Sequence, residues 1–414
     1  MRVRTLTSGR KLEVALRLDP EDDLQGSGQQ EMAIQLLTDS ATIELDADPG
    51  RIHPDLLALA LLAFLAPWAK RRLLLDQGVS AGFADTVSEH VGIEIGPVDD
   101  SLPQRRPGSK HGLMYSGGPD CMAAQVLLDT PMTLFHFRRV RHPRVPNRAT
   151  RFQAGVQEAV VRRTESRGEE LHVARSDLEY LCLPFPTFPH WVALTVGAVL
   201  LAETLDLGRI ATGRNISGIY LGWGKRFTPD GEQESRWEAL YSAAGLSLIH
   251  PLAGATDIVS KRISTTYPHH DLARSCVAGT LEAPCHRCKK CLLTELIKAA
   301  IAGAPLPEHV VASLSSNKSL TRLANRPPPY ADQHLLAYTL ARVPGAESTF
   351  LAPLKAKLAA SADSTGWMDR YYRPALIDRL PSDVADQVAQ RLEGHVDFMT
   401  PEEEKIVENW SAAG

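Results

Sequence analysis

The chain has 414 residues, more than one hydrophobic core usually serves, so we expect two or three domains. Its apolar share of 44% and charged share of 23% are those of a soluble globular protein. The formal net charge of −4 excludes a general electrostatic attraction to nucleic acid or to an anionic membrane, although a local basic patch could still bind either one.

The first part of the chain predicts a small α+β module over residues 1–105. Residues 11–18 and 40–47 alternate apolar and polar side chains as strands do. We predict a helix over about 53–76, a second helix at 83–91 and a short strand at 92–96.

The most apolar stretch, residues 56–68, is 13 residues long and contains Pro67. A helix needs about 20 apolar residues to cross a bilayer, so we interpret this stretch as a buried helix and expect no membrane partner. The first residues lack the apolar core of a signal peptide, and we therefore expect a cytoplasmic protein.

Strands and helices alternate over residues 106–304, after a linker at 99–110 that is rich in proline, glycine and charge. The pattern predicts an α/β fold with a parallel sheet covered on both faces. The predicted strands are residues 111–115, 132–137, 169–175 and 208–214, and the predicted helices are residues 121–129, about 150–163 and 190–205.

No strand pattern appears over residues 305–414, which we expect to form a helical domain. Its predicted helices are residues 332–343, 350–361, 382–396 and 401–410.

A glycine-rich stretch follows the first strand of the α/β region. Five residues separate an apolar strand from an apolar helix there: Ser116, Gly117, Gly118, Pro119 and Asp120. Consecutive glycines let backbone N–H groups point into one concavity, and the helix N-terminus adds unpaired N–H groups and its dipole. The stretch indicates a phosphate-binding loop, and a plain strand-to-helix turn is the alternative.

The segment Tyr115–Cys121, YSGGPDC, resembles the SGGxDS signature of the PP-loop ATP pyrophosphatase superfamily. The resemblance implies a parallel α/β core in which the whole segment, Tyr115 and Pro119 included, contacts the pyrophosphate part of ATP. Family members split ATP between its α- and β-phosphates and transfer AMP to a carbonyl or carboxylate oxygen. Cys121 stands where a second serine is usual, at a helix start whose dipole would lower the pKa of a thiol.

Four of the six cysteines form the pattern C-x8-C-x2-C-x2-C: Cys276, Cys285, Cys288 and Cys291. Two CxxC steps before a helix suit tetrahedral zinc, which would be structural because four thiolates close the site. An iron–sulfur cluster and free buried thiols are the alternatives.

This spacing after a PP-loop resembles the 7-cyano-7-deazaguanine synthase family over residues 111–300. The resemblance implies that Gly213 lines the nucleotide site, and that Ser260 and Lys261 lie near the ATP phosphates with Mg²⁺ bridging them. We expect Asp120 and Lys261 to be catalytic. Around the expected substrate pocket the chain departs from the family, with FPHWVAL (188–194) and NISGIYLGWGKR (215–226) in place of its usual residues.

Other candidate residues carry weaker signals. Asn215 and Ser217 follow the fourth strand at the edge where ligands of such sheets bind, and His190 could act as a base. Asp257 reads as a helix cap. Six arginines between 138 and 151 form either a basic lip or a solvated loop, and Trp223, Lys225 and Arg226 could form a lid.

The resemblance implies an AMP-forming ATP-dependent ligase whose small-molecule substrate bears a carboxylate or amide-like group. Ammonia or an amine would displace the adenylate and give an amide, or a nitrile after dehydration. The alternatives are an adenylating epimerase of a cell-wall precursor, a tRNA-modifying enzyme of the same chemistry and a nucleotide sensor. The sequence does not determine the oligomeric state, and a homodimer is one possibility.

Overall fold

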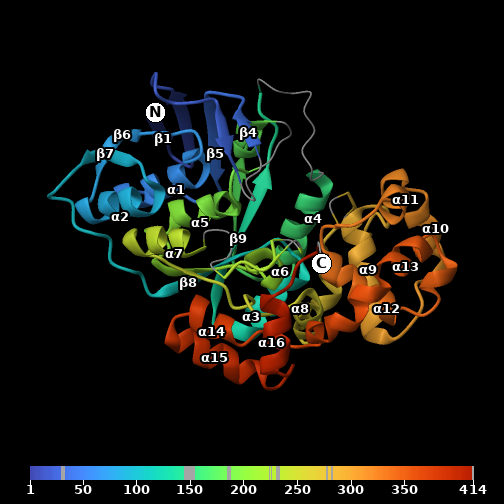
Figure 1. Ribbon diagram of the computed structural model, residues 1–414. Helices are drawn as coiled ribbons and strands as arrows, with labels where there is room; N and C mark the ends of the chain where they lie inside the picture. The colour runs from blue at the N-terminus through green and yellow to red at the C-terminus, as the bar shows by residue number, and fades with distance from the viewer. Residues whose placement is uncertain are drawn as a thin grey trace.

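The computed structural model describes residues 1–28, 33–143, 154–183, 188–222, 224, 226–229, 234–276, 278–280 and 283–412. Within these residues ten strands form one mostly parallel sheet with helices on both faces, which confirms the predicted α/β class (Figure 1). From edge to edge the strands are β13 (Ser247–Ile249), β12 (Leu207–Ala211), β8 (Lys110–Met114), β9 (Met132–Arg139), β10 (Leu171–Ser176), β5 (Ser40–Leu45), β2 (Lys11–Arg17), β1 (Arg2–Ser8), β6 (Arg72–Val79) and β7 (Glu94–Val98). Three short strands, β3 (Gln25–Ser27), β4 (Ala33–Leu36) and β11 (Cys182–Leu183), form a second sheet.

The strands from β13 to β10 are parallel to one another, and the four that the sequence predicted here are confirmed. Strand β13 was missed because three residues are too few to show a period. Strand β5 pairs antiparallel with β10, so the N-terminal strands continue the same sheet.

Alternating side chains of the central strands enter two hydrophobic cores, one on each face of the sheet. Leu134 belongs to the core shared with α3 (Pro119–Leu128), α4 (Ala154–Glu165) and α8 (Asp257–Ser264). The next residue, Phe135, belongs to the core shared with α1 (Pro54–Leu65), α2 (Ala81–Val91), α5 (Val196–Leu201) and α7 (Glu234–Ala243). Period-two alternation thus lets one sheet hold helices on both faces.

The predicted helix over 53–76 is wrong in its second half. Helix α1 ends at Leu65, and residues 72–79 form β6 instead. Pro67 cannot continue the helix, and the apolar run after it is short enough to suit either a strand or a helix. None of the helices that the structure describes is long and apolar enough to cross a membrane.

The described residues after 305 form helices and no named strand, as predicted. Following α9 (Lys289–Ala302), these are α10 (Glu308–Ser315), α11 (Lys318–Asn325), α12 (Gln333–Arg342), α13 (Ala352–Ala362), α14 (Pro374–Arg379), α15 (Ser382–Leu392) and α16 (Pro401–Glu408). Their apolar faces join the core of α3 and α8, and α15 packs against α3 (Figure 1).

The predicted linker is held to the α/β core by the buried side chain of Arg105. Its guanidinium donates to three backbone carbonyls, at 2.6 Å to Gly245, 3.1 Å to Ala202 and 2.8 Å to Leu207. Because Arg105→Ala would remove these three buried hydrogen bonds from a charged donor, we expect it to lower the free energy of unfolding by about 3 kcal/mol in urea titrations. Arg106→Ala, at the exposed neighbour, should cost less than about 0.5 kcal/mol. Equal effects of the two variants would contradict this role of Arg105.

Candidate functional site

The carboxyl ends of β8 and β12 meet where the winding of the sheet reverses. The chain leaves β8 for β9 through α3 on one face, and it reaches β12 from β10 through α5 on the other face. In open α/β sheets ligands bind in the crevice at this position. The glycine loop, residues 115–121, lies there.

One of the two glycines of this loop, Gly117, is required by its geometry. Gly117 has φ +71°, and a Cβ on it would lie 3.1 Å from the side chain of Val160. Gly118 is the N-cap of α3, and no side chain caps the helix. The start of this ten-residue helix therefore lacks a capping side chain for its first N–H groups.

Tyr115 and Gly213 enclose the loop from two sides. The Tyr115 ring is buried, and its hydroxyl accepts a hydrogen bond of 2.6 Å from Arg167. A Cβ on Gly213 would lie 2.9 Å from the carbonyl carbon of Asp120 and 3.0 Å from the nitrogen of Cys121. Only glycine lets the chain after β12 lie this close to the first turn of α3.

The expectation of a low thiol pKa at Cys121 is wrong. Burial raises the pKa of this thiol, although hydrogen bonds from Ser116 act in the opposite direction. The Ser116 N–H donates to the sulfur at 3.3 Å, and the Ser116 hydroxyl lies at the same distance. Desolvation outweighs the helix dipole, and the thiol serves as a small buried group that holds the loop.

One face of α8 lines the crevice beside α3. Asp257, Ser260 and Lys261 are three and four residues apart and so share this face. Ser260 is buried, and its hydroxyl makes no well-formed hydrogen bond with the described residues.

The carboxyl group of Asp120, on α3, faces these side chains. Burial raises its pKa to about 6, against the opposing effects of the Ser260 hydroxyl and of the charges of Lys290 and Lys261. Burial also lowers the pKa of Lys261. A carboxyl, a hydroxyl and cationic groups thus lie together beside the start of α3, which has no capping side chain.

Asp257 is not the helix cap that the sequence predicted. Thr256 caps α8 by accepting a hydrogen bond of 3.1 Å from the Val259 N–H. The Asp257 carboxylate instead accepts a hydrogen bond of 3.0 Å from the Ser217 hydroxyl. Burial, together with the charges of Asp120 and Asp332, raises the pKa of Asp257 to about 7.

His334, on α12, belongs to the same group of side chains, although no sequence pattern indicated it. Its Nε2 lies 2.9 Å from the Ser217 hydroxyl, and its ring stacks on Trp367 at 5.8 Å between centroids. Burial lowers the pKa of His334 to about 4, so the imidazole is neutral at physiological pH. A single histidine in an apolar helix pattern resembles any core residue, and only the packing of α12 reveals its partner.

The remaining predicted substrate residues have local structural contacts. Asn215 caps the short helix α6 (Ile216–Ile219) by accepting from the Gly218 N–H at 3.3 Å, and it also lowers the pKa of Asp257. His190 accepts from the Val192 N–H at 3.4 Å and packs against Trp191 and Trp237. Their predicted substrate roles stay predictions.

The predicted basic lip and lid lie partly outside the described residues. Arg138 pairs with Glu158 at 3.0 Å and Arg139 with Glu179 at 2.7 Å. Arg226 forms an isolated β-bridge with Ser411. The residues that fall outside are Arg144, Arg148, Arg151, Trp223 and Lys225.

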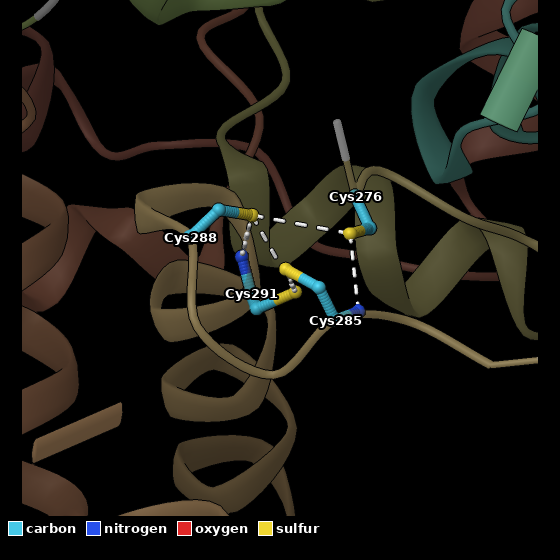
Figure 2. A group of neighbouring side chains, drawn as sticks. All are labelled: Cys276, Cys285, Cys288 and Cys291. Atoms are coloured by element: carbon cyan, nitrogen blue, oxygen red, sulfur yellow. Dashed lines mark hydrogen bonds between the residues drawn. The ribbon is translucent and has the colours of Figure 1, made fainter. Parts of the chain in front are cut away.

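Figure 2 shows the side chains of the four clustered cysteines together; Cys276 and Cys285 precede α9, Cys288 is its N-cap and Cys291 lies in its first turn. Their sulfur atoms all lie within 4.8 Å of one another. The shorter separations are 3.5 Å for Cys288–Cys291, 3.8 Å for Cys285–Cys291 and 4.0 Å for Cys276–Cys288. A zinc tetrahedron with Zn–S bonds of about 2.3 Å has edges of about 3.8 Å, so the four thiols fit zinc.

The backbone around this cluster also suits thiolate ligands. N–H groups of Cys285 and Ala278 point at the sulfur of Cys276, at 3.2 Å and 3.4 Å, and stabilise negative charge there. Cys288 caps α9, whose N-terminal dipole acts in the same direction. In the part of the chain that the structure describes, no other group of His, Cys, Asp or Glu side chains is arranged to hold a metal.

The raised pKa of Asp257 has a measurable consequence for stability. Because the folded state holds this proton more tightly than the unfolded chain, wild-type stability falls as the pH rises from about 4 to about 7. Asp257→Asn removes this dependence. We expect it to gain about 2 kcal/mol relative to wild type between pH 5 and pH 8 in urea titrations.

The exposed Asp386→Asn on α15 serves as the control and should show no such gain. An Asp257→Asn variant with the same pH dependence as wild type would contradict the burial of this carboxyl.

The comparisons with known proteins reach only part of the chain. A family model described as a family of unknown function, DUF6395, matches residues 236–411. The matched segment contains α8, the four cysteines and His334, and it begins after the glycine loop. No curated protein and no solved structure matches the chain. Over residues 236–411 the chain is therefore similar to DUF6395, a family whose description assigns no activity.

Proposed function

We propose that this chain is an ATP-dependent, AMP-forming enzyme with a PP-loop site. In this proposal AMP passes from ATP to a carboxylate or carbonyl oxygen of a small molecule, and pyrophosphate leaves. Ammonia or an amine then displaces the adenylate to give an amide, or a nitrile after dehydration. One observation carries the proposal: the uncapped glycine loop at the switch point faces the Ser260 and Lys261 side chains of α8.

The residues of the crevice suit these roles. Backbone N–H groups of the loop, among them those of Gly117 and Asp120, would bind the departing pyrophosphate, and Lys261 would stabilise the charge that develops on the phosphates. Asp120 offers a carboxylate oxygen, the ligand type that Mg²⁺ prefers next to phosphates. Zn²⁺ held by the four cysteines would be structural, because no coordination position stays open.

Two observations bear on the alternatives. The raised pKa of Asp257 supplies a group that can exchange protons near neutral pH, which favours an adenylating epimerase as the second candidate. Burial raises the pKa of Cys121 and of Cys182, so the two cysteines outside the metal cluster are poor nucleophiles, which weakens a tRNA-thiolating role.

The test is release of pyrophosphate from ATP, assayed with a panel of small carboxylic acids that includes deazapurine acids. We expect at least one acid to stimulate release, and we expect Ser116→Ala and Asp120→Ala to reduce that release. Stimulated release that is unchanged in both variants would overturn the proposal. Transfer of solvent deuterium to the substrate α-carbon would identify the epimerase, and its absence would exclude it.

A further inference from the structure

The segment that enters the cysteine cluster lies directly against the glycine loop. The Arg274 N–H donates to the Gly117 carbonyl at 2.8 Å. A Cβ on Gly118 would lie 3.7 Å from the Ser275 hydroxyl and 3.8 Å from the Arg274 carbonyl oxygen. Neither sheet pairing nor helix packing accounts for this contact, because the segment is irregular between η4 (His270–Leu272) and α9.

We propose that residues 273–276 form a second wall of the phosphate site, that Arg274 contacts the bound phosphates, and that the metal held by the four cysteines keeps this wall in place. This inference rests on the proposed function, and it adds Arg274 and Ser275 to the residues that would contact the pyrophosphate.

The Arg274 side chain has a donor that no described residue uses. Its Nη1 donates to the carbonyls of Asp271 at 2.7 Å and Ala273 at 2.9 Å, whereas its buried Nε has no hydrogen-bond partner. Buried donors are seldom left unpaired, so an unpaired one beside an anion-binding loop indicates a ligand.

The charges around this donor also favour a bound anion. Burial lowers the pKa of Lys261, the charges of Lys298 and Arg274 lower it further, and the charges of Glu295 and Asp120 oppose them, so Arg274 and Lys261 lie within electrostatic range of each other. Holding two like charges together is unfavourable unless an anion joins them. The buried Ser260 hydroxyl lies close enough to Asp120 to lower the pKa of its carboxyl, and so belongs to the same group of side chains.

The metal site determines where this wall can lie. Cys276 follows Arg274 by two residues and belongs to the irregular segment, whereas Cys288 and Cys291 belong to the start of α9. A metal ion bonded to all three would join the irregular segment to a helix that packs in the core. Without the metal, only weak contacts between thiols and backbone N–H groups would hold Cys276.

The first experiment is Arg274→Ala in the full, zinc-loaded chain, with binding of ATP and of inorganic pyrophosphate measured by calorimetry. We expect about tenfold weaker binding of both, with unchanged zinc content and melting temperature. Arg287→Ala removes the same charge from an exposed position inside the cysteine cluster and should leave both affinities within twofold of wild type.

The second experiment removes the metal with a chelator and follows hydrogen exchange of a peptide covering residues 112–122. We expect faster exchange at residues 116–121 and at least tenfold weaker pyrophosphate binding, both restored by added Zn²⁺. Chelation can unfold the chain. If it does, the Arg274→Ala variant, which keeps its zinc, tests whether Arg274 contacts the phosphates.

Unchanged affinities in Arg274→Ala would overturn the inference, and so would a folded metal-free protein that binds pyrophosphate as tightly as before. A wild-type protein that binds neither ATP nor pyrophosphate would overturn the proposed function instead. The exchange measurement would then still show whether the metal holds the loop.

Discussion

Lys261→Ala is expected to lower the rate of pyrophosphate release from ATP by about 10²–10³-fold, the usual loss when one preorganised charge donor is removed from a phosphoryl-transfer site. Lys261 lies on the face of α8 that looks toward Asp120 and the uncapped start of α3. Its half-buried ammonium is poorly solvated, so it interacts more strongly with developing phosphate charge than an exposed lysine does.

The measurement is the initial rate of pyrophosphate release at saturating ATP, with the melting temperature recorded for each variant. Lys298→Ala is the matched control, because Lys298 acts on the pKa of Lys261 but is exposed and pairs with Glu295 on α9. We expect its rate within threefold of wild type. If Lys261→Ala kept both its melting temperature and its rate of pyrophosphate release, the catalytic role would be excluded.

Cys288→Ser is expected to abolish metal binding and to lower the melting temperature by about 10 °C or more. Cys288 both belongs to the predicted ligand set and caps α9, so its loss uncouples the irregular segment from the helix that follows. Binding of a structural zinc ion contributes directly to folding free energy, which is why the effect is large.

Metal analysis and thermal unfolding with and without a chelator are the measurements. Cys182→Ala is the control, since Cys182 is buried in the other hydrophobic core and should keep full zinc content. Iron with visible absorbance in the wild-type protein would favour the iron–sulfur alternative. Full zinc content in Cys288→Ser would contradict the four-cysteine site.

The sequence alone predicted the parts of this protein that depend on local pattern. Period-two alternation predicted β2 and β5, the succession of strands and helices predicted β8, β9, β10 and β12, and two CxxC steps predicted the cysteine cluster. Sequence patterns predicted the wrong element where a segment suits two conformations and its tertiary contacts select one. The apolar run after Pro67 suits a strand or a helix equally, and its pairing with β1 decides for the strand.

The tertiary structure decided which residues share the crevice. His334 meets Ser217 only because α12 packs against the carboxyl end of the sheet, and Arg274 reaches Gly117 only because the chain turns back before the cysteine cluster. Burial reversed the expected pKa shift of Cys121, since desolvation depends on the surrounding core and not on position in a helix. Sequence fixes local conformation through backbone and side-chain preferences, whereas contacts between distant segments depend on how the faces pack, which no local pattern records.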